Sequence, residues 1–473
     1  MAGNRAVPRV FALLLCVASA VAAPVSGQPP APPPARTALI ARLDSIAAAP
    51  VKSGAIAGLA VAVVKGRDTL LHKGYGFADL ENQVPVTPQT VFRIGSITKQ
   101  FTSAAVMQLV EQGKVGLDDD LTKYIPNFPT HGRRILVRHL LNHTSGIPSY
   151  TDIGPRFGAV ARLDLARDSL IAIVAPDSLL FEPGRYFYYN NTGYFMLGMV
   201  LERVTGKKYG DHLAERLFAP NGLSGTVYCD SRRLVPRRAQ GYDRSPAGLV
   251  NTAFISMELP YAAGSLCSTV GDLVAWTARL AGGQIVSAAS YREMTTPVKL
   301  PSGRSMTYGY GLMADTLAGH RLVSHGGGIN GFVSDLLHLP DDSLIVAVLA
   351  NTAPAPASQV ANAIARAVLG APPAPAPTPP RDLPVSPEER ARYVGAYALT
   401  RPDGTKRGVR VFEENGQLMF QQDGLPAVKL ARQDGNVFAA IGQARVAFDV
   451  VNGRATGFVM GGGARTLEAV RRP

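Results

Sequence analysis

Two proline-rich tracts divide this chain of 473 residues into separate folding units. The first, 23–36 (APVSGQPPAPPPAR), and the second, 371–385 (APPAPAPTPPRDLPV), carry no periodic apolar pattern. Proline fixes φ and removes a backbone donor, so both tracts should be extended linkers rather than helices or central strands. We therefore expect a large central domain, 37–370, and a small C-terminal domain, 386–473.

The segment before the first tract has the pattern of a targeting signal. Arg5 and Arg9 precede an apolar run over 10–21, and small residues follow it. This order is typical of a secretory signal peptide, here residues 1–22, and predicts an exported protein that is periplasmic or secreted. No apolar run of about 18 or more residues occurs after it, so no integral membrane span is expected once the signal is removed.

Cysteine is scarce, with three residues in the chain. Cys16 lies inside the signal, and a lipoprotein anchor there is the weaker reading because bulky Leu15 precedes it. Export would place Cys229 and Cys267 in an oxidising environment. We expect a disulfide between them, worth roughly 3–4 kcal/mol by loop closure, with two buried free thiols as the alternative.

The charge balance bears on possible partners. The chain has 48 Lys and Arg against 35 Asp and Glu, a net charge of +13. Its densest basic patch, Arg232, Arg233, Arg237 and Arg238, contains no aromatic residue. A solvated basic surface explains this pattern better than nucleic-acid binding, so no nucleic-acid partner is expected.

The central domain mixes strand and helix patterns. Strands are predicted at both of its ends and helices between them and after them, which favours the α/β class with one antiparallel sheet flanked by helices. The expected strands are 57–64, 69–75, 321–325, 332–339 and 344–349, and the expected helices are 37–48, 97–112, 194–204, 270–280 and 358–369.

The C-terminal domain has the pattern of an all-β unit. Short alternating runs are separated by Asn415-Gly416, Asp423-Gly424, Asp434-Gly435 and Asn452-Gly453. Such dipeptides favour hairpin turns because they accept positive φ, so we expect about seven or eight strands in a small barrel-like unit.

Several familiar sites are absent or unconvincing. The chain has no G-x-S-x-G, H-E-x-x-H, C-x-x-C or Walker A pattern. One G-x-G-x-x-G, at Gly326, Gly328 and Gly331, leads into an alternating strand pattern rather than a helix, which argues against a dinucleotide site. His139 and His143 could share a helical face, but no acidic ligand lies between them. No metal and no cofactor are expected.

One pair of residues does suggest chemistry. Among the lysines of the chain, only Lys99 has a serine three residues before it, Ser96. A helix pattern follows at 97–112, so the two side chains should lie one turn apart on the same face. A lysine made neutral by burial and cationic surroundings can accept the proton of a serine hydroxyl and activate it as a nucleophile.

The context of this pair forms a family pattern. The relevant segments are 92–99 (FRIGSITK), 140–146 (LLNHTSG), 183–194 (PGRYFYYNNTGY) and 325–327 (HGG). In this order the chain, over about 37–370, resembles the penicillin-recognising serine hydrolases: class C β-lactamases, DD-peptidases, D-aminopeptidases and related esterases. The resemblance implies a sheet domain plus an all-helical lobe, with the active site between them.

The resemblance also implies roles. Ser96 would be the acylated nucleophile and Lys99 its proton partner, while the tyrosine of a Y-x-N motif would share the base role and protonate the leaving group. Tyr188 with Asn190 and Tyr189 with Asn191 both fit this motif. The Thr-Gly-Tyr that follows favours Tyr189 and Asn191.

The third motif would complete the site. The backbone N–H groups of Ser96 and Gly328 would form the oxyanion hole, and glycines such as Gly327 would let the substrate backbone approach. His325 stands where the β-lactamase pattern has a lysine. A histidine is mostly neutral at pH 7, which weakens the case for β-lactams and D-Ala-D-Ala ends. Segment 261–266 (YAAGSL) is interpreted as scaffold.

These expectations define a function. The chain should be an exported serine hydrolase that forms an acyl-enzyme on a small ester or a D-amino peptide, including peptidoglycan-derived peptides. The alternatives are a β-lactamase, a DD-carboxypeptidase, or a non-catalytic penicillin-binding-like module. The C-terminal domain resembles the small β domains appended to such hydrolases, and it could gate the site, mediate association or stabilise the protein.

Overall fold

The computed structural model describes residues 34–153, 155–301, 303, 305–374, 381–400, 406–423, 427–440, 444–462 and 465–472. The predicted signal peptide, 1–22, and nearly all of the first linker lie outside these residues, as does 375–380 of the second linker. Among the described residues, no helix combines the length and the apolar character needed to cross a membrane.

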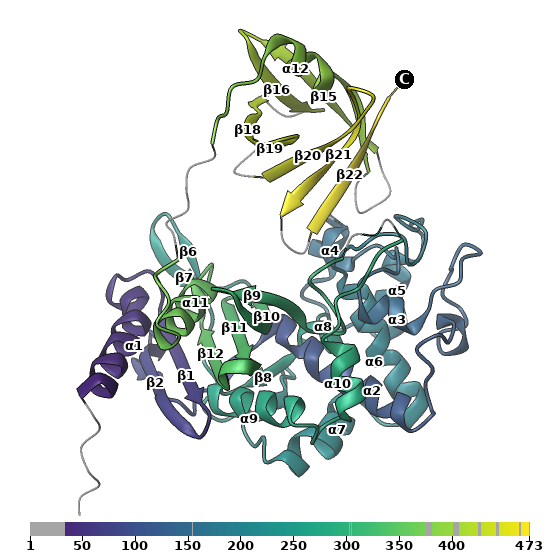
Figure 1. Ribbon diagram of the computed structural model, residues 1–473. Coiled ribbons are helices and arrows are strands. Elements are labelled where there is room, and N and C mark those ends of the chain that lie inside the picture. The colour runs from purple at the N-terminus through teal and green to yellow at the C-terminus, as the bar shows by residue number, and fades with distance from the viewer. Residues whose placement is uncertain are drawn as a thin grey trace, which may run out of the picture.

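A seven-stranded antiparallel sheet forms the centre of the large domain (Figure 1). Strands from both ends of the domain meet in its middle, where β1 (Gly58–Lys65) pairs with β12 (Leu344–Ala350). Every residue of β12 is buried, because helices cover both faces of the sheet. The sheet order is β3 (Val84–Pro85), β2 (Asp68–Asp79), β1, β12, β11 (Phe332–Leu339), β10 (His320–Ile329) and β9 (Met313–Leu317).

The two faces of the sheet contribute to two different hydrophobic cores. Along β1, Val61 and Val63 pack beneath α1 (Pro34–Lys52) and α11 (Ala357–Val368), while Ala60 and Ala62 face the larger core on the other side. Successive side chains of a strand point to opposite faces of the sheet, which explains this division. The sheet and the helices therefore match the α/β expectation, and the side chain of Thr269 caps the start of α9 (Val270–Ala281).

A helical lobe stands beside this sheet in Figure 1 and shares the larger core. Its longest helix, α6, packs against α2, the helix that follows Ser96. The expected all-helical lobe is thus present. Its helices are α3 (Val137–Leu141), α4 (Pro155–Val160), α5 (Arg167–Val174), α6 (Asn191–Thr205) and α7 (Tyr209–Leu213), and α2 is Thr98–Glu111.

A small three-stranded sheet leads directly into the candidate nucleophile. Its order is β4 (Phe92–Arg93), β8 (Leu266–Ser268) and β5 (Val227–Tyr228). A disulfide joins Cys229, which directly follows β5, to Cys267 of β8, with the two Cα atoms 5.4 Å apart. The disulfide therefore stabilises the small sheet whose strand β4 leads into Ser96.

The C-terminal unit has its own sheet and its own core. In the described residues of this unit, nine strands, β14 to β22, form one sheet in which neighbours in sequence are mostly neighbours in space. The sequence predicted seven or eight strands, and one source of the difference is β17, which has only two residues. The strands are Gly395–Thr400, Lys406–Glu414, Gln417–Gln422, Val428–Lys429, Ala431–Asp434, Val437–Ala440, Ala444–Val451, Arg454–Gly462 and Arg465–Arg471.

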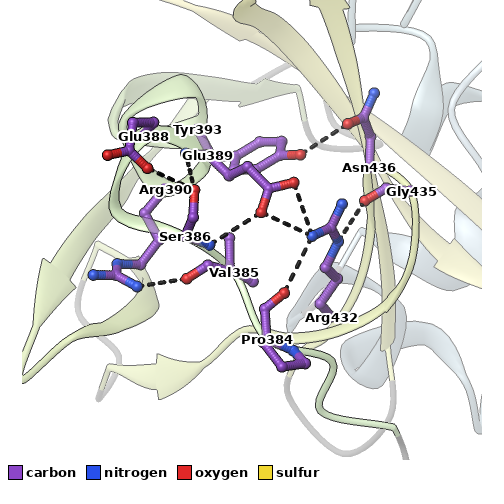
Figure 2. A network of polar contacts seen from close by, with 10 residues as sticks. All are labelled: Pro384, Val385, Ser386, Glu388, Glu389, Arg390, Tyr393, Arg432, Gly435 and Asn436. Carbon is purple, nitrogen blue, oxygen red and sulfur yellow. Dashed lines mark hydrogen bonds and ion pairs between the residues drawn. The ribbon is translucent and has the colours of Figure 1, made fainter.

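A polar network fastens the start of this unit to its sheet (Figure 2). Ser386 caps α12 (Pro387–Tyr393) in a reciprocal capping box with Glu389. Arg432 reaches from β18 to both carboxylate oxygens of Glu389, at 3.0 and 3.1 Å. Tyr393 donates to the side chain of Asn436 at 2.8 Å. The helix is therefore held by paired, hydrogen-bonded charges.

Candidate active site

The structure places Ser96 and Lys99 at the junction of two helical segments. Ser96 lies in a 3-10 turn, Gly95–Ile97, and Lys99 is in the first turn of α2. Gly95 has φ of +50°, and a Cβ there would lie 2.8 Å from the backbone nitrogen of Gly328. Only glycine fits this position, and its fit brings the nucleophile turn against β10.

Lys99 is the centre of the polar contacts. Its Nζ lies 3.1 Å from Ser96 Oγ, 2.8 Å from Asn191 Oδ1 and 2.9 Å from the carbonyl oxygen of Ala263. The amide and carbonyl oxygens can only accept, so they take two N–H bonds. The third contact is with a hydroxyl, which can donate its own proton to the lone pair of a neutral amine.

The electrostatics of Lys99 favour that neutral amine. The side chain is fully buried, and this desolvation holds its pKa well below the usual lysine value. No carboxylate within the described ranges forms an ion pair with Lys99. The sequence had suggested cationic surroundings as a second cause, but burial is the cause that the structure supports.

The two candidate tyrosines point in different directions. The ring of Tyr189 lies 4.8 Å from Lys99 Nζ, measured to the ring centroid. The hydroxyl of Tyr188 instead donates to Asp152 Oδ2 at 2.9 Å. The structure thus brings Tyr189, the tyrosine that the sequence favoured, to the serine–lysine pair.

The two candidate asparagines also separate. Asn190 caps α6, where its side-chain oxygen accepts from the backbone of Gly193 at 2.9 Å. Asn191 begins the helix, accepts from Lys99 and donates to Thr151 Oγ1 at 3.2 Å. Asn191 is therefore the one that touches the reactive pair, and Asn190 sets the start of its helix.

His325 is buried against Tyr189 and Tyr308 and is not exposed beside Ser96. Its Nδ1 lies 2.6 Å from the carbonyl oxygen of Gly326, so Nδ1 carries the proton and Nε2 accepts from the hydroxyl of Tyr308 at 2.9 Å. Burial, followed by the nearby Lys99, lowers the pKa of His325 to about 3. The imidazole is therefore neutral, as the sequence suggested, but for a reason that only the packing reveals.

The two glycines after His325 differ in position. A Cβ at Gly327 would lie 2.0 Å from the carbonyl oxygen of Ile94, so this residue allows β10 to approach the chain that enters the nucleophile turn. A Cβ at Gly328 would lie in open space, and Gly328 lines the cavity at Ser96. Gly327 is not among the cavity-lining residues.

A cavity of about 140 Å³ opens at Ser96. Aromatic and aliphatic side chains dominate its walls, and neither lysine nor arginine is among them. The lining residues are Ser96, Tyr150, Thr151, Phe157, Asn191, Ile255, Leu259, Pro260, Ala263, Gly264, Gly328, Ile329 and Asn330. A larger cavity of about 1030 Å³ lies behind Tyr261 in the helical lobe, but none of the motif residues lines it.

This arrangement of serine, lysine, tyrosine and a glycine-bearing strand agrees with a known family. The family model described as Beta-lactamase matches residues 43–371. The chain belongs to the Beta-lactamase family. It is accordingly a serine hydrolase, and the fold described above is that of the β-lactamase and transpeptidase-like proteins.

Individual relatives agree with this assignment. Penicillin-binding protein 4* of Bacillus subtilis (strain 168) is 29% identical over 436 residues, which cover 87% of this chain and 94% of that protein. D-aminopeptidase of Gluconobacter oxydans (strain 621H) is 30% identical over 317 residues, 67% of this chain and 59% of that enzyme. The solved D-amino acid amidase from Ochrobactrum anthropi SV3 is 27% identical, with a TM-score of 0.62 over 70% of this chain and 99% of that one.

Three contributors to the site escaped the sequence reasoning. The carbonyl of Ala263 belongs to a segment interpreted as scaffold, yet it binds Lys99. Tyr308 holds His325, and its only sequence signal was the alternation of tyrosine and glycine over 308–311. From their spacing, His139 and His143 could share a helical face, but α3 ends at Leu141 and His143 has φ of +61°.

Proposed function

We propose that this family member is an exported hydrolase that forms an acyl-enzyme on Ser96 and cleaves small esters or amides, including those of D-amino acids. The observation that carries the proposal is the buried Lys99, which contacts Ser96 Oγ at 3.1 Å without a carboxylate to keep it charged. The D-aminopeptidase and the D-amino acid amidase named above support the amide part of the proposal.

The proposed chemistry runs in two halves. Ser96 Oγ attacks the carbonyl carbon while its proton passes to Lys99 Nζ, and the backbone N–H groups of Ser96 and Gly328 stabilise the oxyanion. Tyr189, beside Lys99, protonates the leaving alcohol or amine as the carbon–oxygen or carbon–nitrogen bond breaks. The proton held by Lys99 then passes to Tyr189 and restores its hydroxyl. Water attacks the acyl carbonyl carbon and gives a proton to Lys99, and this proton passes to Ser96 Oγ as the bond between Oγ and the acyl carbon breaks.

The walls of the cavity favour neutral substrates. A fixed cation would be needed to hold a carboxylate next to the scissile bond. The residues that line the cavity include no lysine or arginine, burial disfavours the charged form of Lys99, and His325 is neutral and buried. An engineered apolar cavity of about 150 Å³ accommodates benzene. The cavity of about 140 Å³ is therefore large enough for a short alkyl or a phenyl group.

Export rests on the signal-peptide pattern of residues 1–22, and the disulfide between Cys229 and Cys267 is compatible with it. A fusion of residues 1–36 to a reporter that is active only outside the cytoplasm tests export. Retention of the reporter inside the cell would contradict it.

A substrate panel tests the chemistry. A nitrophenyl ester, a D-alanyl anilide and nitrocefin are incubated with the wild type and with Ser96→Ala. We expect turnover of the ester or the anilide, little of nitrocefin, and loss of turnover in Ser96→Ala together with loss of a covalent acyl adduct by mass spectrometry. Hydrolysis that survives the loss of Ser96 would overturn the proposal.

A further inference from the structure

His143 occupies an unusual position beside the reactive residues. It is 1% exposed, and its backbone lies in the left-handed region at φ of +61°. Residues other than glycine adopt this conformation at a cost, and such strain concentrates at functional sites. In this conformation, both the carbonyl group and the side chain of His143 face the same segment of the chain.

That segment is the one that carries Tyr189. The backbone N–H of Tyr188 donates to the carbonyl oxygen of His143 at 2.8 Å. The backbone N–H of Asn190 donates to Nδ1 of the His143 ring at 3.0 Å. One residue therefore holds the chain on both sides of Tyr189, and the residue between the two hydrogen bonds loses most of its freedom.

The ring of His143 also bounds the tyrosine side chain. Its centroid lies 4.3 Å from that of Tyr189, 4.6 Å from that of Tyr308 and 5.1 Å from that of Tyr194. The Tyr189 ring is in turn 4.8 Å from Lys99 Nζ. The imidazole is thus packed on the side chain whose place beside Lys99 the proposed chemistry requires.

The protonation of His143 fits this task. Since Nδ1 accepts a hydrogen bond, it carries no proton, and the proton of the neutral ring is on Nε2. Burial first, and then the neighbouring Lys99 and His325, hold the pKa of His143 well below its usual range. Nε2 itself has no hydrogen-bond partner in the described structure. Burying an unpaired N–H is costly, which is unexpected of a side chain kept for packing alone.

We propose that His143 is the positioning residue of the catalytic tyrosine: its carbonyl and its Nδ1 fix the backbone on both sides of Tyr189, and its ring holds the tyrosine beside Lys99. This role rests on the proposed function of Tyr189. In the described residues, the hydrogen bonds of Lys99 go to Ser96, Asn191 and Ala263 and not to His143, so His143 acts on the reaction through Tyr189.

The chain provides a matched control in His139. Its Nδ1 also accepts a backbone hydrogen bond, from Leu136 at 3.2 Å, and burial lowers its pKa to about 4. In the described residues, the ring contacts with Tyr189, Tyr194 and Tyr308 are made by His143 and not by His139. His139→Phe therefore removes the same kind of hydrogen bond without touching the tyrosine.

The test uses the full-length enzyme and a nitrophenyl ester. His143→Phe keeps a ring and loses the acceptor, whereas His143→Asn loses the ring and keeps an acceptor near the place of Nδ1. We expect His143→Phe to lower kcat about 10²-fold with little change in KM, as displacements near 1 Å do in active sites. His143→Asn should recover part of that loss, and His139→Phe should leave kcat unchanged.

A double-mutant cycle separates positioning from general damage. If His143 acts through Tyr189, His143→Phe should add almost nothing to the loss already caused by Tyr189→Phe. Fully additive losses, or a loss in His143→Phe no larger than in His139→Phe, would overturn the inference. If His143→Phe does not fold, His143→Gln, whose amide is displaced from the Nδ1 position, enters the same cycle with the same expectation.

The outcomes also distinguish this inference from the proposed function. Hydrolysis that survives in Ser96→Ala would refute the function itself. Hydrolysis that needs Ser96 and Tyr189 but tolerates His143→Phe would leave the function standing and refute the positioning role alone.

Discussion

Two basic side chains in this protein have opposite surroundings. Arg432, in the C-terminal unit, binds both oxygens of Glu389 and the carbonyl oxygens of Pro384 and Gly435 (Figure 2). Lys99, in the catalytic domain, contacts a hydroxyl, an amide oxygen and a carbonyl oxygen, with no carboxylate. Both side chains are held by oxygens, but of the two only Arg432 is paired with a carboxylate.

The difference separates a structural network from a reactive one. A cation paired with a carboxylate keeps its proton and fixes two elements of the fold. A lysine buried without a counter-charge loses affinity for its proton, and the pKa of Lys99 is accordingly well below its usual value. The structure therefore leaves this amine able to take up a proton from Ser96.

Removing each of these two basic side chains should give the largest contrast. Lys99→Met should lower kcat/KM by about 10³-fold or more, because general-base catalysis is worth roughly 10²–10⁴. Arg432→Met should leave kcat/KM of a small ester unchanged, since its contacts lie within the C-terminal unit. Steady-state kinetics with purified variants check both. Equal losses in the two variants would contradict the distinction between the networks.

The two adjacent tyrosines should differ next. Tyr189→Phe removes the hydroxyl of the ring beside Lys99 and should lower kcat about 10²-fold or more. Tyr188→Phe removes a hydrogen bond to Asp152 and should cost roughly 1 kcal/mol of stability while leaving kcat within a few-fold of the wild type. Kinetics and thermal unfolding of both variants provide the measurement. A larger kinetic loss in Tyr188→Phe would reverse the assignment.

The pH profile should report the neutral lysine. If Lys99 accepts the proton of Ser96, kcat/KM falls as the pH decreases through the pKa of Lys99, and it is constant above that value. Because burial lowers this pKa, the enzyme should be fully active far below the usual lysine pKa of about 10.4. A rate that climbs steadily up to about pH 10 would show that Lys99 titrates like an exposed lysine. A stable substrate, such as an anilide, avoids background hydrolysis at high pH.

The sequence predicted the fold where its signals are local. The apolar runs that became β11 and β12 are bounded by turns, and Asn415-Gly416 and Asn452-Gly453 both take the positive φ that hairpin turns need. The spacing of Ser96 and Lys99 is equally local, because one helical turn places them together. These features could be predicted because few residues determine them.

The remaining parts of the site depend on contacts between distant segments. The carbonyl of Ala263 and the side chain of Asn191 reach Lys99 from 164 and 92 residues away. No local sequence signal predicts the full burial of Lys99 or the hydrogen bond between Tyr308 and His325. The left-handed backbone of His143 is a further example, because the spacing of His139 and His143 indicated only that the two could share a helical face.

The smallest expected effect concerns acid stability and isolates the C-terminal unit. The backbone N–H of Ser386, at 3.0 Å, and then Arg432 hold the pKa of Glu389 below its usual value. A carboxylate whose pKa is lower in the folded than in the unfolded state stabilises the fold above the unfolded-state pKa, about 4.3, and that stabilisation is lost as the pH falls through the folded-state pKa. Glu389→Gln should therefore reduce stability at neutral pH and flatten the acid dependence of this unit. Hydrogen exchange of the strands β14 to β22 measures this loss.

The single tryptophan gives the internal comparison, because Trp276 is buried against Phe101 in the catalytic domain and does not report on the C-terminal sheet. Its fluorescence should be the same in Glu389→Gln and the wild type over the pH range in which exchange differs. Glu388 directly precedes Glu389 and accepts a hydrogen bond from Ser386, but it does not contact Arg432. Glu388→Gln should therefore change the hydrogen exchange of the strands less. If the hydrogen exchange of β14 to β22 and the fluorescence of Trp276 changed over the same pH range in Glu389→Gln, the two units would unfold together. In that case the paired charges of Arg432 and Glu389 would also stabilise the domain that holds Lys99.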